Sequence, residues 1–436
     1  MSEHSTPAAM GEKPGLALHW QILLAILLAA IAGSLSGTDG GLFGVTWYQV
    51  YDFVGTLFLN ALFMIIVPLI MASIITGIAT IGSSSDFGRI GLKTLLYFMG
   101  SGALAILVGL GYINLVTPGI ADGQPVGAQL NLSMDTDAVQ QVLTRVEGRD
   151  MGDIVNIFLR MVPTNVVAAA AGADMLALIF FSIVFGFFMT RIPQRQSEVL
   201  MLFWQGVSET MMLITKWIMT FAPYGVFGLV ARTVAATGFG AFMPLLWFFL
   251  TVLAGLLTHL FVVLPMLLKF FGKVSPWKHK QAMLPVLLTA FSSASSSATL
   301  PVSMECVRKG AGVSERTASF VLPLGATINM NGTALYECSA AIFLAQAYGL
   351  ELSFSTQLLV VVMALLTSIG VAGIPAASLV AITVILTAIG LPAEAIGLLL
   401  VTDRILDMVR TAINVYSDTV GAVLIARSEN ETGLRH

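Results

Sequence analysis

The last long hydrophobic segment of the chain, residues 396–426, carries an unusual number of polar and charged side chains. They are Asp403, Asp407, Arg410, Thr411, Asn414 and Asp418. At about 100° per residue, these positions fall within roughly 100° of arc on an α-helix, along about 22 Å of its axis. A charge inside a membrane costs at least about 2.5–3.5 kcal/mol, so such a stripe indicates a binding or permeation site.

The side chains of this stripe suit a small ligand with both signs of charge. The guanidinium of Arg410 is planar and matches a carboxylate with two parallel donors. Asp407 can accept a substrate ammonium, and Asn414 can bind a second carboxylate. Asp418, together with Asn414 and nearby main-chain carbonyls, makes an oxygen-only site that suits a hard cation such as Na⁺. A ligand with one ammonium and two carboxylates, aspartate or glutamate, satisfies this set.

Plainer interpretations of the stripe stay open at this point. Asp407 and Arg410 stand at i and i+3 and could form a structural ion pair. Asp403 lies beside Arg404 and could sit at the water-exposed end of the helix. The stripe has three aspartates for one arginine, however, and the unmatched charges require cations from elsewhere.

The composition predicts an integral membrane protein. Of 436 residues, 57% are hydrophobic and 10% are charged, against about 25% charged residues in soluble domains. Apolar runs long enough to cross a bilayer begin near Trp20, Val54, Leu95, Leu176, Met211 and Met243. Lysines and arginines collect in alternate connections, which predicts cytoplasmic N- and C-termini. The net charge of −3 argues against a nucleic-acid partner, and two cysteines predict neither a disulfide framework nor a metal site.

The second half of the chain has hydrophobic segments that are interrupted by Ser-, Gly- and Pro-rich patches. These patches are Ser292–Pro301, Asn329–Thr333 and Gly370–Ser378. Broken backbone at membrane depth is tolerated where it is buried or lines a cavity, and paired broken segments point to a carrier's binding site. Two re-entrant hairpins are therefore expected, the alternative being small-residue helix packing.

Other classes of protein fit the sequence less well. An intramembrane serine hydrolase would use the serine cluster, but it needs a base, and the histidines lie outside the motifs: His4, His19, His259, His279 and His436. A channel would also line its pore with polar residues, but the close Arg/Asp spacing favours binding. The sequence predicts a carrier and not an enzyme.

The chain resembles the excitatory amino acid transporter family, also called the dicarboxylate/amino acid:cation symporters, over nearly its whole length. The motifs that carry the resemblance are Ser295–Pro301 (SSSATLP), Pro323–Tyr336 (PLGATINMNGTALY), Gly370–Pro375 and Asp403–Asp418. The resemblance implies an all-α membrane protein with eight transmembrane helices and two re-entrant hairpins, working as a homotrimer by elevator motion in the inner membrane of a prokaryote.

The resemblance also implies a division of the chain. Residues 1–18 and 429–436 would be cytoplasmic tails. Residues 19–280 would form mainly the scaffold, with its third and sixth helices moving with the transport domain. Residues 281–428 would form the transport core: hairpin 1, helix 7, hairpin 2 and helix 8.

By the same resemblance, ligands for the substrate and for sodium are carried over residue by residue. Arg410 and Thr333 would hold the side-chain carboxylate, Asp407 and Thr411 the amino group, and Asn414 with the backbone of Ser296 the α-carboxylate. The rest of the substrate site would be Gly373 and Ile374 in hairpin 2. One Na⁺ site would comprise Gly325, Asn329, Asn414 and Asp418. A second would use main-chain carbonyls of Thr327, Ser368, Ile369 and Val371.

The departures from the family pattern concern the coupling ions. Positions of a third Na⁺ site are occupied here by Phe98, Ser101, Gly102 and Asn331. The carboxylate is replaced by an amide, so about two coupled Na⁺ are expected. Glu337 is the candidate for carrying a proton, since burial favours a neutral acid; the alternative is a static hydrogen-bonded carboxyl. Ala294 and Met408 stand where the family usually has a second arginine, which removes one salt bridge.

The exact substrate stays open at the level of sequence. Asp407 disfavours a C4-dicarboxylate without an amino group, and Arg410 disfavours a neutral amino acid, but either remains an alternative. Aspartate and glutamate are not separated.

Overall fold

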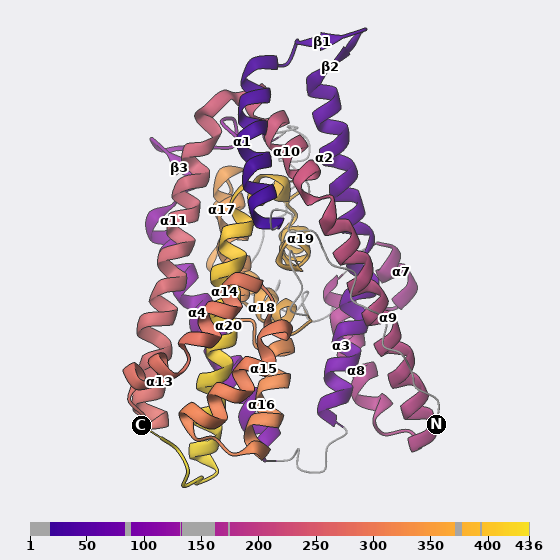
Figure 1. Ribbon diagram of the computed structural model, residues 1–436. Helices are drawn as coiled ribbons and strands as arrows, with labels where there is room; N and C mark the ends of the chain where they lie inside the picture. Colours follow the sequence, from indigo (N-terminus) through magenta and orange to yellow (C-terminus); the bar gives the residue numbers. More distant parts are fainter. Residues whose placement is uncertain are drawn as a thin grey trace, which may run out of the picture.

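The computed structural model describes residues 18–82, 89–130, 132, 162–172, 175–370, 377–392 and 395–435. Nearly all regular structure in these ranges is helical (Figure 1). The strands form two short antiparallel ribbons, β1 (Gly41–Leu42) with β2 (Val45–Thr46) and β3 (Ile120–Ala121) with β4 (Gln124–Pro125). The described structure is therefore all-α, and its two short ribbons lie in the connections between helices.

One group of helices comes from the first half of the chain. Its members are α1 (Leu18–Ser36), α2 (Trp47–Met64), α3 (Ile66–Gly82), α7 (Val166–Ala171), α8 (Met175–Met189), α9 (Gln194–Thr220) and α10 (Ala222–Thr237). Helix α10 packs on α1 and α2, and α3 packs on α8 and α9. Helices α9 and α10 meet at an angle of 55°. Pro223 near the start of α10 explains the break, because proline cannot donate the N–H that would continue α9.

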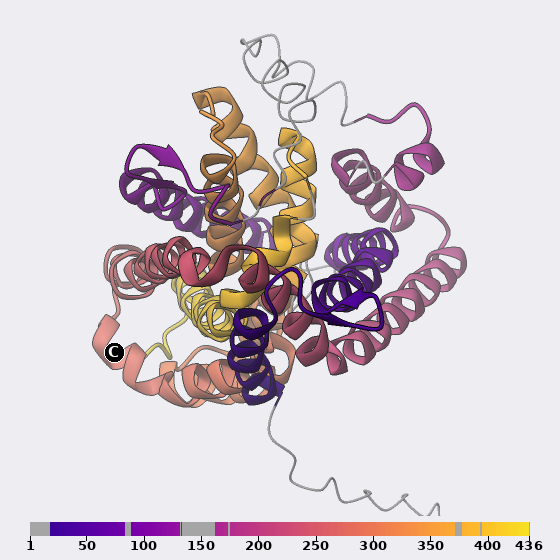
Figure 2. The same cartoon turned by 90° about the horizontal axis from the view of Figure 1, so that it is seen from above.

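A second group surrounds α20 (Ile396–Ser428). From the first 280 residues it takes α4 (Ile90–Val116) and α11 (Phe242–Thr258), both of which pack on α17 and α20. The polypeptide continues from α11 through η2 (His259–Val263), α12 (Leu264–Leu267), η3 (Leu268–Gly272) and α13 (Pro276–Ala282), and η1 (Gly238–Ala241) precedes α11. The figures show the yellow α20 lying beside the pink α11 and among orange helices from the second half of the chain (Figures 1 and 2).

The first broken segment is a pair of short helices, as predicted. Helix α14 (Leu284–Ser293) ends at Ala294, which has a left-handed φ of 48°. Ser295 then caps α15 (Ser296–Cys306), its hydroxyl accepting from the N–H of Ala298 at 3.2 Å. The arms pack on each other, and η4 (Val307–Ala311) prolongs the second arm.

The second broken segment has the same form. Its arms, α18 (Phe354–Gly370) and α19 (Ala377–Ile389), pack on each other and on α17. The pair α14–α15 is called hairpin 1 below, and the pair α18–α19 is called hairpin 2. The predicted tip, with Val371, Gly373 and Ile374, lies outside the described residues.

The interruption predicted over Asn329–Thr333 is narrower than expected. Helix α16 (Glu315–Ile328) ends before Asn329, and α17 (Asn331–Ala347) begins two residues later. The prediction that Asn331 to Thr333 are unwound is wrong, because Asn329 and Met330 alone have non-helical backbone angles at this junction. Thr333 therefore projects from the first turn of α17.

The outer helices expose large apolar side chains, whereas α20 hides almost its whole length. Exposed examples are Leu35 on α1, Trp217 on α9 and Phe270 on η3, at 83%, 62% and 63%. Exposed apolar surface of this extent indicates contact with lipid. The described residues contain three helices long and apolar enough to cross a membrane, or four if α9 and α10 form one bent span.

Residues after α20 fasten the end of the chain to the second group. The Glu431 carboxylate accepts from the N–H of Ser314 at 2.8 Å and from its hydroxyl at 2.6 Å. Arg435 donates through its N–H to the Ala311 carbonyl at 2.9 Å. Lys93 on α4 donates to Glu429 at 2.7 Å. The C-terminal residues thus connect α4, hairpin 1 and α20.

Candidate substrate and ion site

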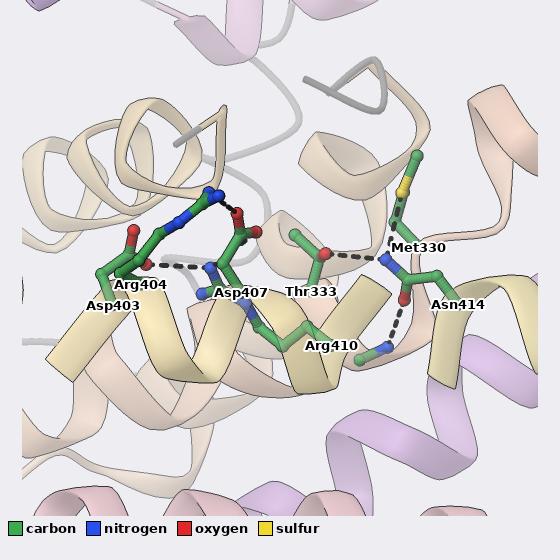
Figure 3. A network of polar contacts seen from close by, with 8 residues as sticks. Met330, Thr333, Asp403, Arg404, Asp407, Arg410 and Asn414 are labelled. Atoms are coloured by element: carbon green, nitrogen blue, oxygen red, sulfur yellow. Dashed lines mark hydrogen bonds and ion pairs between the residues drawn. The ribbon is translucent and has the colours of Figure 1, made fainter. Parts of the chain in front are cut away.

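Arg410 lies at the centre of a buried charge network on α20 (Figure 3). Its Nη2 donates to Asp403 Oδ1 at 2.9 Å and to Asp407 Oδ1 at 3.1 Å. Arg404 adds a longer ion pair to Asp407 Oδ2, at 3.4 Å. Placing Asp403 at a water-exposed end was wrong, because this side chain is buried and bonded to Arg410. The charges of Asp403 and Asp407 are thus balanced by those of Arg404 and Arg410. The excess negative charge expected for the stripe is that of Asp418.

The remaining donors of Arg410 are free to take a ligand. Its guanidinium carbon lies 3.9 Å from the centre of the Tyr336 ring. Among the described residues, Nε and Nη1 of this fully buried side chain have no hydrogen-bond partner. Unpaired buried donors are costly unless something accepts from them. Nε and Nη1 point in different directions, so each of them can donate separately to an oxygen of an anionic ligand.

Asn414, one turn beyond Arg410, connects α20 to the start of α17. Its Oδ1 accepts from the N–H of Gly332 at 2.7 Å, and its Nδ2 contacts Thr333 Oγ1 at 3.0 Å and Met330 Sδ at 3.3 Å (Figure 3). A Cβ on Gly332 would lie 3.0 Å from the Arg410 carbonyl oxygen, so glycine permits this close approach of the helices. Asn414 thus contacts Thr333, and the Arg410 main chain lies against Gly332; their roles as substrate ligands stay predictions.

The other predicted substrate residues are placed less completely. Thr411 is buried on α20, and Ser296 is buried at the first turn of α15, a helix that packs on α20. First-turn N–H groups have no intrahelical acceptor and favour an anion. Asp403, Arg404 and Asp407 border a cavity of about 20 Å³ together with Phe58 and Val226 of the first group. The charged network therefore faces the helices of the first group across a small gap.

Asp418 lies in a separate, oxygen-rich pocket. Its Oδ1 accepts from Asn329 Nδ2 at 2.8 Å, while Asn329 Oδ1 has no partner among the described residues. A Cβ at Gly325 would collide with the Asp418 carboxylate, so glycine brings the α16 backbone up to it. Asn414 instead bonds to α17, so the structure unites three of the four predicted ligands.

In the described part of the chain no three His, Cys, Asp or Glu side chains cluster as a metal site. One carboxylate with amide and carbonyl oxygens fits a monovalent hard cation.

The second predicted Na⁺ site is described in part. Thr327 lies in the last turn of α16 and Ser368 in the last turn of α18, and these two helices pack on each other. Both hydroxyls bond within their own helices, Thr327 to the Leu324 carbonyl at 2.9 Å and Ser368 to the Leu365 carbonyl at 2.8 Å. Ile369 belongs to α18 as well. The main-chain carbonyls of this set remain predicted ligands.

The residues assigned to a degenerate third site do gather between α4 and α17. Asn331 Oδ1 lies 3.5 Å from the position of a Cβ on Gly102, while Phe98 and Ser101 are buried on the same helix. Asn331 Nδ2 donates to Ser417 Oγ at 2.7 Å and lies 3.5 Å from His259 Nε2. Hydrogen bonds thus engage the amide at the position where a carboxylate would bind a cation.

Glu337 and the two arginine-lacking positions complete the predicted set. Glu337 is fully buried on α17, and its Oε2 accepts from Thr367 Oγ1 of hairpin 2 at 2.8 Å. Ala294 is buried at the hairpin 1 junction, and Met408 is half-buried on α20. Hairpin 1 therefore brings no arginine to the site from its junction.

Several functional neighbours were missed from the sequence. Tyr336 and Ser417 lie inside the motifs quoted above, but nothing in the sequence around them indicates that they contact the site. Ser417 accepts from Asn329 and Asn331 as well as contacting Tyr97, whose hydroxyl lies 3.1 Å away. His259 lies outside these motifs in the sequence, but in the fold it is next to Asn331. Nothing in one sequence shows such contacts between distant segments.

Buried charges on one helix, enclosed by two helical hairpins and an apolar exterior, define a helical membrane protein with an internal ligand site. A family model described as "Sodium:dicarboxylate symporter family" matches residues 18–428. The chain belongs to this family.

Named relatives cover most of the chain. It is 35% identical to the "Proton/glutamate-aspartate symporter" of Escherichia coli (strain K12), over 95% of this chain and 93% of the relative. It is 33% identical to the "Proton/sodium-glutamate symport protein" of Bacillus caldotenax, over 95% of each chain. It is 32% identical to the human "Neutral amino acid transporter B(0)", over 95% of this chain and 81% of the relative. Overall identity therefore does not separate acidic from neutral substrates.

Proposed function

We propose that this protein is a secondary active symporter that takes up aspartate or glutamate with sodium. One observation carries the proposal: Arg410 is held against Tyr336 with Nε and Nη1 unpaired among the described residues. These donors bind the side-chain carboxylate with Thr333. Asp407, with Thr411, accepts the substrate ammonium. Asn414 and the first turn of α15 bind the α-carboxylate, and Gly373 and Ile374 complete the substrate site.

The coupling ions bind beside the substrate. Asp418, Asn329 and the Gly325 main chain form one sodium site, whose carboxylate has no cation partner in the described ranges. The carbonyls of Thr327, Ser368, Ile369 and Val371 form the second. Asn331 leaves a third site unused, and Glu337 carries a proton as the neutral acid.

Energetics sets the minimum number of coupled ions. A tenfold sodium gradient supplies about 1.4 kcal/mol per ion, and 100 mV supplies about 2.3 kcal/mol per net charge. A substrate of charge −1 gains from a negative interior only when at least two cations accompany it. Two Na⁺, with or without a proton, meet this requirement.

The moving part is the group of helices around α20. Packing of α4 and α11 on α17 and α20 supports their movement with residues 281–428. The other helices of residues 19–280 form a scaffold, and eight spans with two re-entrant hairpins make up the subunit. Three subunits assemble in the inner membrane of a prokaryote with both termini in the cytoplasm. Each transports by an elevator motion.

Neutral amino acids are the second candidate substrates. The likeness to a neutral amino acid transporter favours them. The unpaired donors of Arg410 disfavour them, because these donors would remain buried without an acceptor. A C4-dicarboxylate would leave Asp407 without an ammonium. The charged side chains of α20 therefore favour acidic amino acids over neutral amino acids and C4-dicarboxylates as substrates.

Uptake of radiolabelled aspartate into proteoliposomes tests this function. Sodium and pH gradients are imposed separately, with serine and succinate as competing ligands. We expect accumulation that requires an inward sodium gradient and is inhibited by glutamate far more than by the competitors. Uptake without dependence on either gradient, or inhibition led by serine, would contradict the proposal.

A further inference from the structure

Among the described residues of hairpin 2, Thr367 is the one that makes a hydrogen bond to Glu337, the proposed proton carrier. Thr367, on α18, is 1% exposed, and its Oγ1 lies 2.8 Å from Glu337 Oε2. The same oxygen lies 2.8 Å from the Met363 carbonyl and 3.2 Å from that of Ala364. Glu337 Oε1 has no hydrogen-bond partner among the described residues. The Thr367 hydroxyl is thus the polar group of hairpin 2 that Glu337 meets.

A hydroxyl has one hydrogen and two lone pairs, so Thr367 cannot donate to both acceptors at once. When Glu337 is ionised, its carboxylate only accepts, and the charge-assisted bond draws the hydrogen from the Met363 carbonyl. When Glu337 is protonated, it donates to Thr367 Oγ1, and Thr367 donates to Met363. The hydrogen-bond chain therefore reverses direction with the protonation of Glu337.

We propose that Thr367 is a positioning residue that transmits the protonation of Glu337 to hairpin 2. This inference rests on the proposed proton-carrying role of Glu337 and assigns its partner. Thr367 stands three residues before Gly370, where α18 ends, and next to Ser368 of the proposed second sodium site. A proton on Glu337 therefore changes the hydrogen bond that Thr367, near the end of α18, donates: to the Met363 carbonyl instead of to Glu337.

Charged and titratable groups on the neighbouring elements leave Thr367 as the direct contact. Helices α18 and α19 carry no other ionisable side chain in their described residues, and α11 carries none before His259, which bonds Asn331. Helix α4 offers Lys93, Tyr97 and Tyr112, each bonded elsewhere. On α17 itself, Tyr336 and Cys338 are adjacent. Helix α20 carries Asp403, Arg404, Asp407, Arg410, Tyr416, Asp418 and Arg427. Of these, Arg410 interacts electrostatically with Glu337.

Replacing Thr367 by valine keeps the shape and removes the hydroxyl. The ionised Glu337 then loses its donor, which favours the protonated form, because hydrogen bonds to charged groups are the stronger ones. We expect the pH of half-maximal aspartate uptake on the alkaline side to rise by about one unit in T367V. T367S, which restores the hydroxyl, is expected to follow the wild-type profile.

The pH profile of proteoliposome uptake is measured for the wild type, T367V, T367S, E337Q and E337Q/T367V. E337Q should abolish the alkaline limb, and T367V should add nothing in that background. If E337Q keeps the limb, the proton role of Glu337 fails and the inference with it. If E337Q abolishes the limb but T367V leaves it in place, only the inference fails. Should T367V be inactive, activity of E337Q/T367V would support the hydroxyl role, and inactivity of both would show a packing role and overturn it.

Discussion

The guanidinium of Arg410 stacks on the ring of Tyr336, with 3.9 Å between the guanidinium carbon and the ring centroid. Arg410 comes from α20 and Tyr336 from α17, so the contact holds the predicted carboxylate clamp across two helices. Asp403 and Asp407 both accept from a single nitrogen of Arg410, Nη2. The ring and the two carboxylates together position the remaining donors, Nε and Nη1.

Removing the Tyr336 ring should leave the Arg410 guanidinium less firmly positioned. A buried cation–π contact is worth about 1–2 kcal/mol, so Y336L should raise the KM for aspartate roughly 5- to 30-fold. Y336F keeps the ring and should stay within about threefold of the wild type. Initial uptake rates in proteoliposomes at fixed sodium measure both. Equal behaviour of the two variants would show that the ring has no special role.

Asp418 should govern the response to sodium. Replacing it in D418N keeps the shape but removes the charge beside Asn329, and the attraction between unit charges at close range is large in a poorly solvated pocket. The sodium concentration for half-maximal uptake should rise at least about tenfold. D52N, at the ion pair of Asp52 with Arg232 outside the site, is the control and should keep wild-type sodium activation. An unchanged D418N response would place the sodium elsewhere.

Gly332 should tolerate no side chain. A Cβ there would lie 3.0 Å from the Arg410 carbonyl oxygen and 3.3 Å from Asn414 Oδ1. Overpacking of this kind costs about 1–3 kcal/mol, so G332A should lower both thermal stability and aspartate affinity. Gly111 on α4 has open space around its Cβ position, and G111A should be neutral or stabilise by up to about 1 kcal/mol. Thermal unfolding in detergent compares the two, and equal stability would refute the close-packing argument.

Glu429 should contribute a pH-dependent part of stability at the end of α20. The hydrogen bond from Lys93, with a further contribution from Arg89, lowers the pKa of its carboxyl below the usual range. A lowered folded-state pKa means that the stabilisation is complete above the unfolded value of about 4.3 and disappears as pH falls through the folded value. E429Q should lower Tm by no more than about 2 °C at pH 7, and the difference should disappear as pH falls from about 4.3 through the lowered folded-state pKa.

Thermal unfolding of E429Q at several pH values tests this, with E209Q at the exposed Glu209 on α9 as control. A Tm difference that persists unchanged at acidic pH would contradict the ion-pair explanation.

The sequence predicted those features that follow from local pattern. The helix of residues 396–426 emerges as α20 with its stripe buried, because 3.6-residue periodicity places Asp403 to Asp418 on one face. Ser295 and Gly370 likewise marked the ends of real helices, since serine caps and glycine breaks are local effects.

Contacts between distant segments could not be predicted in this way. The pairing of Arg404 with Asp407 and the approach of His259 to Asn331 depend on how helices rotate and pack. The narrow break at Asn329 and Met330 was also missed. Gly332 looked like a helix breaker, whereas it serves close packing of α17 on α20 within a helix.

Aspartate uptake by R410C tests the central claim most directly. Wild type, R410C and R404C are reconstituted and compared under one inward sodium gradient, R404C being the matched arginine at the longer ion pair to Asp407. Losing one partner of a buried charge pair costs about 2–5 kcal/mol. We therefore predict that kcat/KM for aspartate falls by at least about 30-fold in R410C and by less than about tenfold in R404C. Aspartate uptake by R410C at the wild-type level would contradict the assignment of Arg410 as the carboxylate clamp.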